Sequence, residues 1–245
     1  MAKLRADQAL VARGLVESRA KAQALIMAGK VFSGERRIEK AGATLLDEAP
    51  LEVRGQDHPW VGRGGLKLDH AVQHFGLDVG GRVCIDVGSS TGGFTDVLLS
   101  HGAARVYAVD VGKGQLAWRL RTDERVVVLE GVNARHLTQA HIPEPIDAIV
   151  CDASFIGLSI VLAQPLTFAR SGAWLAALIK PQFEAGRALV GKNGIVRDAE
   201  VRRMCVDRVV IWLQDGAGWQ VGGVTESPIT GAEGNVEFLV TATKP

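Results

Sequence analysis

A glycine-rich turn that joins an apolar strand to a helix constrains this fold more than any other feature of the sequence. The apolar run RVCIDVG leads into SSTGGFT, and the helical stretch DVLLSHG follows. Glycines permit tight turns and close backbone approach, and a strand–turn–helix context is what a nucleotide-binding loop requires. A dinucleotide-binding loop would place glycine at positions 88, 90 and 93, but position 90 is serine. The turn therefore predicts a nucleotide-type cofactor site and leaves the cofactor open.

Apolar runs alternate with helical stretches on both sides of this turn. The runs RVCIDVG, ARVYAVDV, RVVVLEG and DAIVCD have strand composition and are separated by helical segments. This alternation is typical of a parallel sheet with helices on both faces. The last strand-like runs, at about 219–226 and 236–242, have no long helix between them, so we expect an antiparallel edge there. The sequence predicts a Rossmann-like α/β domain whose sheet is mostly parallel.

The N-terminal part of the chain has a different pattern. Apolar residues recur at helical spacing over 4–14 and 18–29, which predicts two short helices. Ser18 is a candidate N-cap and Gly29 a candidate C-terminal stop, after which Val31-Phe32 begins a short strand and a turn. We therefore expect a compact helix–helix–hairpin unit.

A turn-rich segment separates the two patterns. The residues GQDHPWVG contain two glycines and a proline, which suits a domain boundary. We expect a small N-terminal α+β domain at 1–54, a linker at 55–62 and a larger domain at 63–245. Trp60 in the linker is either a packing anchor, which we favour, or a group that couples the two domains.

Basic residues outnumber acidic ones only in the N-terminal part. The whole chain has a net charge of +1, whereas residues 1–54 contain ten Lys or Arg against seven acidic residues. An ordinary solvated surface would also have mixed charges, and a basic patch favours phosphate binding only where its members share a face. The candidates for such a face are Arg5, Arg19, Lys21, Lys30, Arg36, Arg37 and, just after the linker, Arg63.

The same segment resembles the alpha-L RNA-binding motif, a domain first known from a protein of the small ribosomal subunit. The resemblance covers most of the first 54 residues and is carried by the core residues Ser18, Arg19, Ala22, Ile26, Gly29 and Val31. It implies that the second helix and the hairpin dock against structured RNA. It also favours RNA over DNA as the partner.

Acidic residues around the glycine-rich turn narrow the choice of cofactor. Asp110 ends the next strand about 20 residues after the turn, where a carboxylate can accept hydrogen bonds from the ribose hydroxyls of an adenosine cofactor. Asp86 directly before the turn would repel a pyrophosphate, and Ser90 is bulkier than the glycine of a dinucleotide site. S-adenosylmethionine (SAM) has no pyrophosphate and therefore fits better than NAD.

The segment DVGSSTGGFTD closely resembles motif I of the class I methyltransferases. That resemblance implies SAM as the cofactor, and it places Asn133, after the third strand, near the adenine. The expected cofactor-binding residues are Asp86, Gly88, Ser90, Thr91, Gly92, Gly93, Phe94, Asp110 and Asn133.

Four ionisable residues stand out by their positions. Lys67 lies in RGGLKL, Asp152 at the end of AIVCD, Lys180 near the end of AALIKP and Glu237 within the strand-like run NVEFLV. Lysine and glutamate are rarely buried without partners, so these residues form either structural salt bridges or a site. Asp152 and Lys180 follow strands at the sheet edge where ligands bind in open α/β folds, which favours a site.

This combination suits methyl transfer to a ribose 2′-hydroxyl. The hydroxyl is a poor nucleophile near neutral pH, so transfer benefits from a base that takes its proton. A lysine can serve if desolvation and a neighbouring ammonium lower its pKa. We expect Lys180 to be the base, Asp152 to orient it, Lys67 to be the neighbouring cation that steadies the hydroxyl, and Glu237 to position the lysines.

The order Lys, Asp, Lys, Glu on a SAM-binding fold is similar to that of the FtsJ-type RNA ribose methyltransferases. The whole chain resembles the TlyA family of rRNA cytidine 2′-O-methyltransferases, which are also known as haemolysins, in RGGLKL, GQLAWRLR, DASFIGL, IKPQFEAG, GIVRD and GNVEFL. The resemblance implies rRNA or a ribosomal subunit as partner. Two departures are the linker residues HPWV, where some members carry an arginine, and the short segment after Glu237, which favours methylation of the large subunit only.

Two other kinds of function are the alternatives. A membrane-active haemolysin would need an apolar span of roughly 20 residues or a broad apolar helical face, and neither is evident. A ribosome assembly factor without catalysis would not need all four ionisable residues. Cys84, Cys151 and Cys205 are expected to be buried thiols, and His70 with His74 lacks a third ligand, so we expect no metal site. We expect a cytoplasmic protein.

Overall fold

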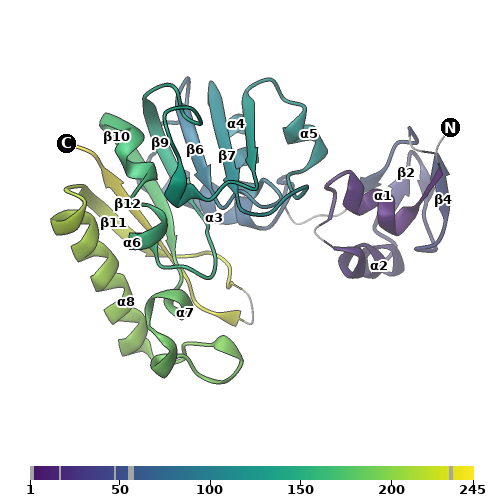
Figure 1. Ribbon diagram of the computed structural model, residues 1–245. Coiled ribbons are helices and arrows are strands. Elements are labelled where there is room, and N and C mark those ends of the chain that lie inside the picture. The colour runs from purple at the N-terminus through teal and green to yellow at the C-terminus, as the bar shows by residue number, and fades with distance from the viewer. Residues whose placement is uncertain (1–2, 17, 47, 55–57, 232–233) are drawn as a thin grey trace.

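A large sheet forms the centre of the C-terminal part of the molecule. The computed structural model describes residues 3–16, 18–46, 48–54, 58–231 and 234–245 (Figure 1). Within these residues a seven-stranded sheet has the order β11-β12-β10-β9-β6-β7-β8. The strands are β6 (Val83–Val87), β7 (Arg105–Asp110), β8 (Val126–Glu130), β9 (Ile146–Cys151), β10 (Ala169–Ile179), β11 (Gln220–Glu226) and β12 (Phe238–Thr243).

The direction of pairing confirms the predicted sheet. Strand β6 pairs in parallel with β7 and β9, and the parallel order continues to β8 on one side and β10 on the other. Strand β12 is antiparallel to both β10 and β11. The domain is thus a Rossmann-like fold with an antiparallel edge, as predicted.

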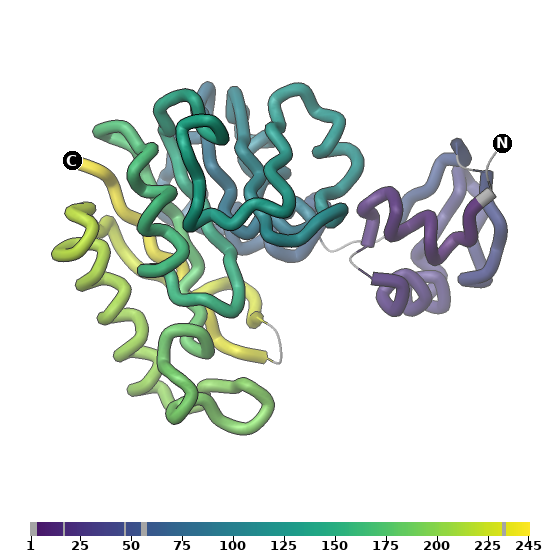
Figure 2. Tube along the Cα trace, in the orientation of Figure 1, coloured from purple at the N-terminus to yellow at the C-terminus, as the bar shows by residue number. Residues whose placement is uncertain are grey.

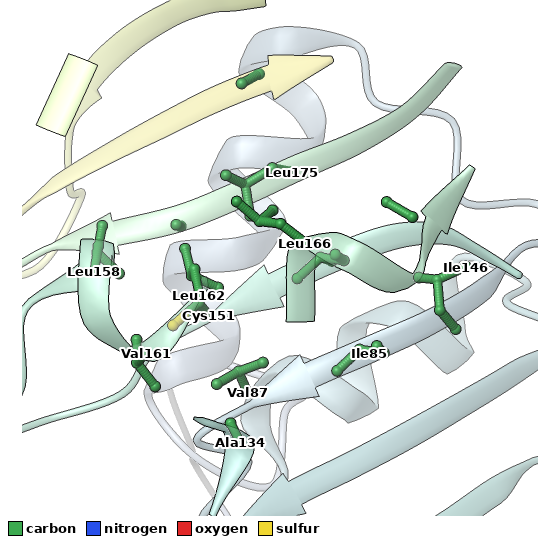
Figure 3. Close-up of a cluster of buried hydrophobic side chains, with 14 of the residues drawn as sticks. Ile85, Val87, Ala134, Ile146, Cys151, Leu158, Val161, Leu162, Leu166 and Leu175 are labelled. Atoms are coloured by element: carbon green, nitrogen blue, oxygen red, sulfur yellow. The ribbon is translucent and has the colours of Figure 1, made fainter. Parts of the chain in front are cut away.

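Helices cover both faces of this sheet. They are α3 (Gly64–Phe75), α4 (Gly93–Ser100), α5 (Trp118–Arg121), α6 (Leu158–Val161), α7 (Pro181–Glu184) and α8 (Ala199–Ile211). On one face α3 and α4 bury Leu68 and Leu98 against the strands. On the other face α6 buries Leu158, and Leu162 just after it lies in the same buried cluster as Ile149 of the sheet (Figure 3 shows part of this cluster). Burial on both faces explains the almost continuous apolar strand sequences.

The N-terminal unit has a small core of its own. Its elements are β1 (Lys3–Arg5), α1 (Ala6–Ala12), α2 (Arg19–Met27), β2 (Val31–Ser33), β3 (Arg36–Arg37), β4 (Thr44–Leu46) and β5 (Glu52–Val53). Leu10, Ile26 and Val31 are buried together in it. The Oγ of Ser18 accepts a hydrogen bond from the amide of Lys21 at 3.2 Å, which confirms the predicted cap.

The predicted start of the first helix is wrong. Residues 3–5 form strand β1, which pairs with β4 through Leu4 and Leu45, and α1 begins only at Ala6. The helical spacing of the apolar residues did not reveal this strand, because its pairing partner lies about forty residues later in the sequence. The helix–hairpin order of the rest of the unit is as predicted.

The N-terminal unit contacts the larger unit at Gly14. Gly14 has φ +64°, and a Cβ at this position would lie 2.4 Å from Cα of Ala117, just before α5. The trace in Figure 2 shows the two units side by side. Residues 55–57 of the predicted linker lie outside the described residues. The predicted boundaries at 54 and 62 therefore stay predictions.

Other properties of the fold bear on the predictions from composition. Cys84, Cys151 and Cys205 are free and buried, as predicted. In the part of the chain that the structure describes, no helix is both long enough and apolar enough to cross a membrane. His70 and His74 stack on α3 with ring centroids 5.4 Å apart.

Candidate active site

The strand register brings the four predicted catalytic residues to one edge of the sheet. Val87 is paired with Cys151, so the glycine-rich turn and Asp152 leave adjacent strands side by side. Ile179 is paired with Phe238, so Lys180 and Glu237 are neighbours across β10 and β12. Glu237 directly precedes β12 and does not lie inside it, which corrects the sequence prediction. This position at the strand end is what turns its carboxylate toward the site.

The four side chains form a chain of alternating charge. Nζ of Lys67 lies 2.8 Å from Oε2 of Glu237 and 3.7 Å from Oδ2 of Asp152. The other carboxylate oxygen of Asp152 lies 2.7 Å from Nζ of Lys180. Lys67, Lys180 and Glu237 are 8%, 7% and 2% exposed. Such buried charges are tolerable only because each has an opposite charge beside it.

Lys67 reaches this chain because two helices begin almost in contact. A Cβ on Gly93, the first residue of α4, would lie 2.9 Å from the backbone nitrogen of Gly65 in α3. On the other side of Gly65, Trp60 packs so closely that a Cβ there would lie 2.3 Å from its Cγ. Trp60 also contacts the apolar cluster under α3 and α4, which supports its interpretation as a packing anchor.

Two further residues take part that the sequence predictions did not include. Ser154 Oγ accepts a hydrogen bond from Nζ of Lys180 at 2.8 Å, and the backbone oxygen of Asp152 accepts another at 3.0 Å. The amide of Gln182 donates to Oε1 of Glu237 at 3.4 Å. Both residues stand two positions after a predicted catalytic residue, in DASFIGL and IKPQFEAG, and this proximity is the signal that could have found them.

Two cavities meet at this edge. The first, about 570 Å³, is lined by all four charged residues together with Arg63 at the start of α3. The second, about 510 Å³, contains Asp110 and Asn133. Both are lined by Gly88, Ser90, Asp152, Ser154 and Phe155. The charged chain therefore faces a space that continues directly into the cavity of the predicted cofactor residues.

The second cavity fits an adenosine-type cofactor. The carboxylate of Asp110 accepts hydrogen bonds from the amides of Ser90 at 2.8 Å and Gly112 at 2.7 Å. A carboxylate has about four acceptor positions, so two stay available for a ribose diol. The remaining wall includes apolar side chains that can enclose a flat ring: Val87, Val109, Val111, Val132, Ala134, Ile156 and Val161. The side chain of Asn133 accepts from the amide of Arg135 at 3.1 Å.

The glycine-rich turn shapes the junction of the cavities. Gly88 has φ +82°, and a Cβ there would lie 2.8 Å from Cα of Ala153, so the turn can pass this closely over the Asp152 segment only with glycine. Ser90, Thr91, Gly93 and Phe94 line the first cavity. Gly92 instead packs against Leu120.

Asp86 lies beneath the turn. It is fully buried, and its Oδ2 accepts a hydrogen bond from Oγ1 of Thr95 at 2.7 Å. Burial raises the pKa of Asp86 to about 7, against the hydrogen bond from Thr95, which lowers it. Near neutral pH this carboxyl is therefore only partly charged. Because Asp86 lines neither cavity, it would repel a pyrophosphate less strongly than expected from its place directly before the turn in the sequence.

An exposed aromatic residue stands at the junction. Phe155 is 90% exposed, has φ +67° and lines both cavities. Its ring centroid lies 5.1 Å from that of Phe183 after Lys180. A large apolar side chain with this exposure, held in the left-handed region, is unusual outside functional sites. Phe155 is not among the site residues predicted from the sequence.

On the N-terminal unit a buried carboxylate accepts hydrogen bonds from some of the predicted RNA-binding residues. Asp7 is fully buried, and its oxygens accept hydrogen bonds from Arg5 at 3.0 Å, Arg19 at 3.1 Å and Gln23 at 3.2 Å. The hydrogen bond from Arg5, with those from Gln23 and Arg19, holds the pKa of Asp7 well below its usual range, although burial opposes this. Lys21, Arg36 and Arg37 are exposed on the same unit.

Two family models match the chain. The model described as FtsJ-like methyltransferase matches residues 60–244, and the model described as S4 domain matches residues 4–49. The second match confirms the predicted alpha-L fold, for which the S4 domain is the first-known example.

Two related proteins and a solved structure resemble the chain over nearly its whole length. The chain is 47% identical to a provisionally named rRNA methyltransferase, YqxC, of Bacillus subtilis, over 97% of this chain and 85% of that protein. It is 46% identical to the 16S/23S rRNA (cytidine-2′-O)-methyltransferase TlyA of Mycobacterium tuberculosis, over 96% of this chain and 88% of that one. A solved structure from Streptococcus thermophilus, provisionally named a hemolysin, is 40% identical, covers 100% of this chain and 89% of its own, and has a TM-score of 0.76.

Proposed function

The chain belongs to the FtsJ-like methyltransferase family, in the group that includes TlyA, and we propose that it methylates the ribose 2′-oxygen of a cytidine in rRNA with SAM as the methyl donor. The observation that carries the proposal is the chain of alternating charge from Glu237 through Lys67 and Asp152 to Lys180. All four residues line the first cavity, and Asp152 also lines the second. A methyl acceptor in the first cavity would therefore face a donor in the second.

Residues of the second cavity would hold the cofactor. In this proposal Asp110 accepts hydrogen bonds from the ribose hydroxyls, Asn133 lies beside the adenine, and the backbone from Gly88 to Ser90 lies against the methionine part. When bound, SAM supplies a methyl group on a positively charged sulfur. Asp152, which lines both cavities, stands beside the path of transfer.

The charged chain would activate the acceptor hydroxyl. Lys180 serves as the base that takes the hydroxyl proton, and Asp152 together with Ser154 fixes its amino group. Lys67 stands on the other side of Asp152 as an ammonium, where it steadies the hydroxyl and the negative charge that develops on oxygen. Glu237 holds Lys67 in place through their ion pair, and Gln182 in turn donates a hydrogen bond to Glu237.

The N-terminal unit would select and hold the RNA. Arg5 and Arg19 share the carboxylate of Asp7, and each guanidinium has N–H donors left over for phosphate oxygens. We propose that these residues, with Lys21, Lys30, Arg36, Arg37 and Arg63, contact structured rRNA. The substrate we propose is the large ribosomal subunit or its RNA, which would place the enzyme in the cytoplasm.

Methyl transfer from labelled SAM is the direct test. Purified full-length protein is incubated separately with large subunits, small subunits and the rRNA from each, and labelled nucleotides are mapped. We expect label on the 2′-oxygen of a cytidine from the large subunit. Label on a base would overturn the proposed chemistry, and label in the small subunit alone would overturn the proposed substrate. No label in any of these substrates, by protein that binds SAM, would overturn the function itself.

A further inference from the structure

A basic segment lies beside the first cavity, on elements that the proposed function does not use. We name residues 186–198, between α7 and α8, the arm; it contains the short helical turns Arg187–Leu189 and Lys192–Gly194. In Figure 1 it is the green excursion below α7. Val190, Asn193 and Gly194 of the arm line the same cavity as Lys67 and Lys180.

The charge of the arm has one sign until its last residue. Arg187, Lys192 and Arg197 are its cations, and no acidic residue precedes Asp198. All three are exposed, and among the described residues none of them forms an ion pair. By contrast, Arg121 and Arg170 elsewhere on this domain are paired with carboxylates. The arm therefore presents three exposed cations that have no carboxylate partner within the described part of the chain.

A buried amide holds the arm in a defined shape. Asn235 is 3% exposed, and its Oδ1 accepts a hydrogen bond from the amide of Val196 at 3.1 Å. Its Nδ2 donates to the backbone oxygen of Gly194 at 3.0 Å. Val196 is itself buried against Ala185. The arm is thus fixed to the segment that leads into Glu237 only two residues later, so its cations have a set position relative to the charged chain.

We propose that the arm is an RNA-binding element of the methyltransferase domain, which holds backbone phosphates next to the target nucleotide. The inference rests on the proposed function, because a nucleotide in the first cavity must have its neighbouring phosphates at the rim. Lys192 is exposed and lies in the sequence between Val190 and Asn193, which line that cavity, so this proposal places its ammonium group at the rim. Phosphate contacts set register and carry most of the salt dependence of binding. Asn235 acts in this proposal as a positioning residue for the arm.

The experiment measures steady-state methylation with the rRNA substrate that the wild-type protein modifies. The variants are Lys192→Ala, Arg197→Ala and the double variant, and the matched control is Arg203→Ala, which removes one positive charge from the exposed face of α8. We expect the double variant to raise KM for RNA about tenfold at physiological salt. We also expect the slope of log affinity against log salt concentration to become less steep by about 0.7–0.9 per lost phosphate contact. The values of kcat and of the SAM dissociation constant stay unchanged.

The outcomes separate the two proposals. A wild-type protein that methylates no RNA would overturn the proposed function. A wild-type protein that methylates RNA, with the double variant unchanged in both KM and salt slope, would overturn the role of the arm alone. A KM increase that is equally large in Arg203→Ala would also overturn it, because the effect would then be one of total charge.

The positioning role of Asn235 has its own test. We expect Asn235→Ala to raise KM for RNA. We expect the triple variant with Lys192→Ala and Arg197→Ala to be no worse than the double variant, because the two cations beside Gly194 and Val196, which Asn235 holds, are already absent. Additive effects on KM would overturn the positioning role. A fall in kcat with an unchanged KM would overturn it as well, since it would indicate a disturbance of Glu237.

Discussion

Lys180 is surrounded by oxygen atoms that fix its amino group at one point. Its Nζ contacts the carboxylate and backbone oxygen of Asp152 and the hydroxyl of Ser154. Removal of these contacts by Lys180→Ala takes away the proposed base and leaves the second cavity intact. We expect kcat to fall by a factor of about 10²–10⁴, the usual contribution of a general base. Methyl transfer is measured under single-turnover conditions, and SAM affinity is measured by calorimetry and stays unchanged.

Lys180→Arg serves as the control for charge. It keeps a cation beside Asp152 but cannot act as a base near neutral pH, because a guanidinium holds its proton. Activity of Lys180→Arg close to that of the wild type would show that the position needs a cation and not a base. Retention of more than a tenth of the rate in Lys180→Ala would remove Lys180 from the chemistry.

Asp86 should make the stability of the fold depend on pH. Its pKa is raised from 3.8 to about 7 in the folded state, so between these values the folded protein holds a proton that the unfolded chain has lost. The free energy of unfolding therefore falls as pH rises from about 4 to about 7 and then levels off. At about 1.4 kcal/mol per pKa unit, the effect is on the order of a few kcal/mol.

The variant Asp86→Asn tests this directly. An amide has the same shape and never ionises, so the fall in stability between pH 5 and pH 8 should be smaller in the variant than in the wild type. Denaturant unfolding of the cofactor-free protein at both pH values measures the difference. Parallel pH profiles for the two proteins would show that Asp86 does not titrate in this range.

The turn after β6 depends on one close approach between two backbone segments. A methyl group on Gly88 would meet the backbone of Ala153 at 2.8 Å, and the backbone there has φ +82°. Gly88→Ala should move the turn away from Asp152 and lower SAM affinity at least tenfold. The matched control is Gly81→Ala, because Gly81 has φ +69° but a methyl group there would meet nothing within 4 Å. Both variants share the strain of a positive φ, so equal SAM affinities would contradict the role of close approach.

Elements with strong local signals were predictable from the sequence. Strands β6 to β9 were found because burial on both faces makes their sequences continuously apolar, and the cap at Ser18 was found because it depends on neighbours three residues away. Strand β1 was missed, since it exists through pairing with β4.

The order of Lys67, Asp152, Lys180 and Glu237 indicated a site, but only the fold shows how they meet. Ser154 and Phe155 were missed because an exposed serine or phenylalanine in a loop carries no periodic signal.

Two basic surfaces lie on different units of the molecule. One consists of the N-terminal residues around Asp7, and the other is the arm beside the first cavity. Two modest contacts with one RNA strengthen each other, because the second forms within an already bound complex. In the proposed function the N-terminal surface contributes only to the binding of RNA, whereas the other unit contributes the arm to binding and carries out the chemistry.

Charge reversal on the N-terminal unit tests this division. The variant Arg19→Glu with Lys21→Glu should raise KM for RNA at least tenfold at physiological salt, with a smaller salt slope than the wild type, because phosphate contacts are lost. The value of kcat at saturating RNA and the SAM affinity should stay unchanged, since neither residue lines the two cavities. Lys21→Glu alone covers the case in which loss of the Arg19–Asp7 pair unfolds the unit. The control is the same charge reversal at Arg202 and Arg203 on α8. An equal rise in KM for RNA in this control would contradict the division between the units. A fall in kcat in the N-terminal variant would contradict it as well.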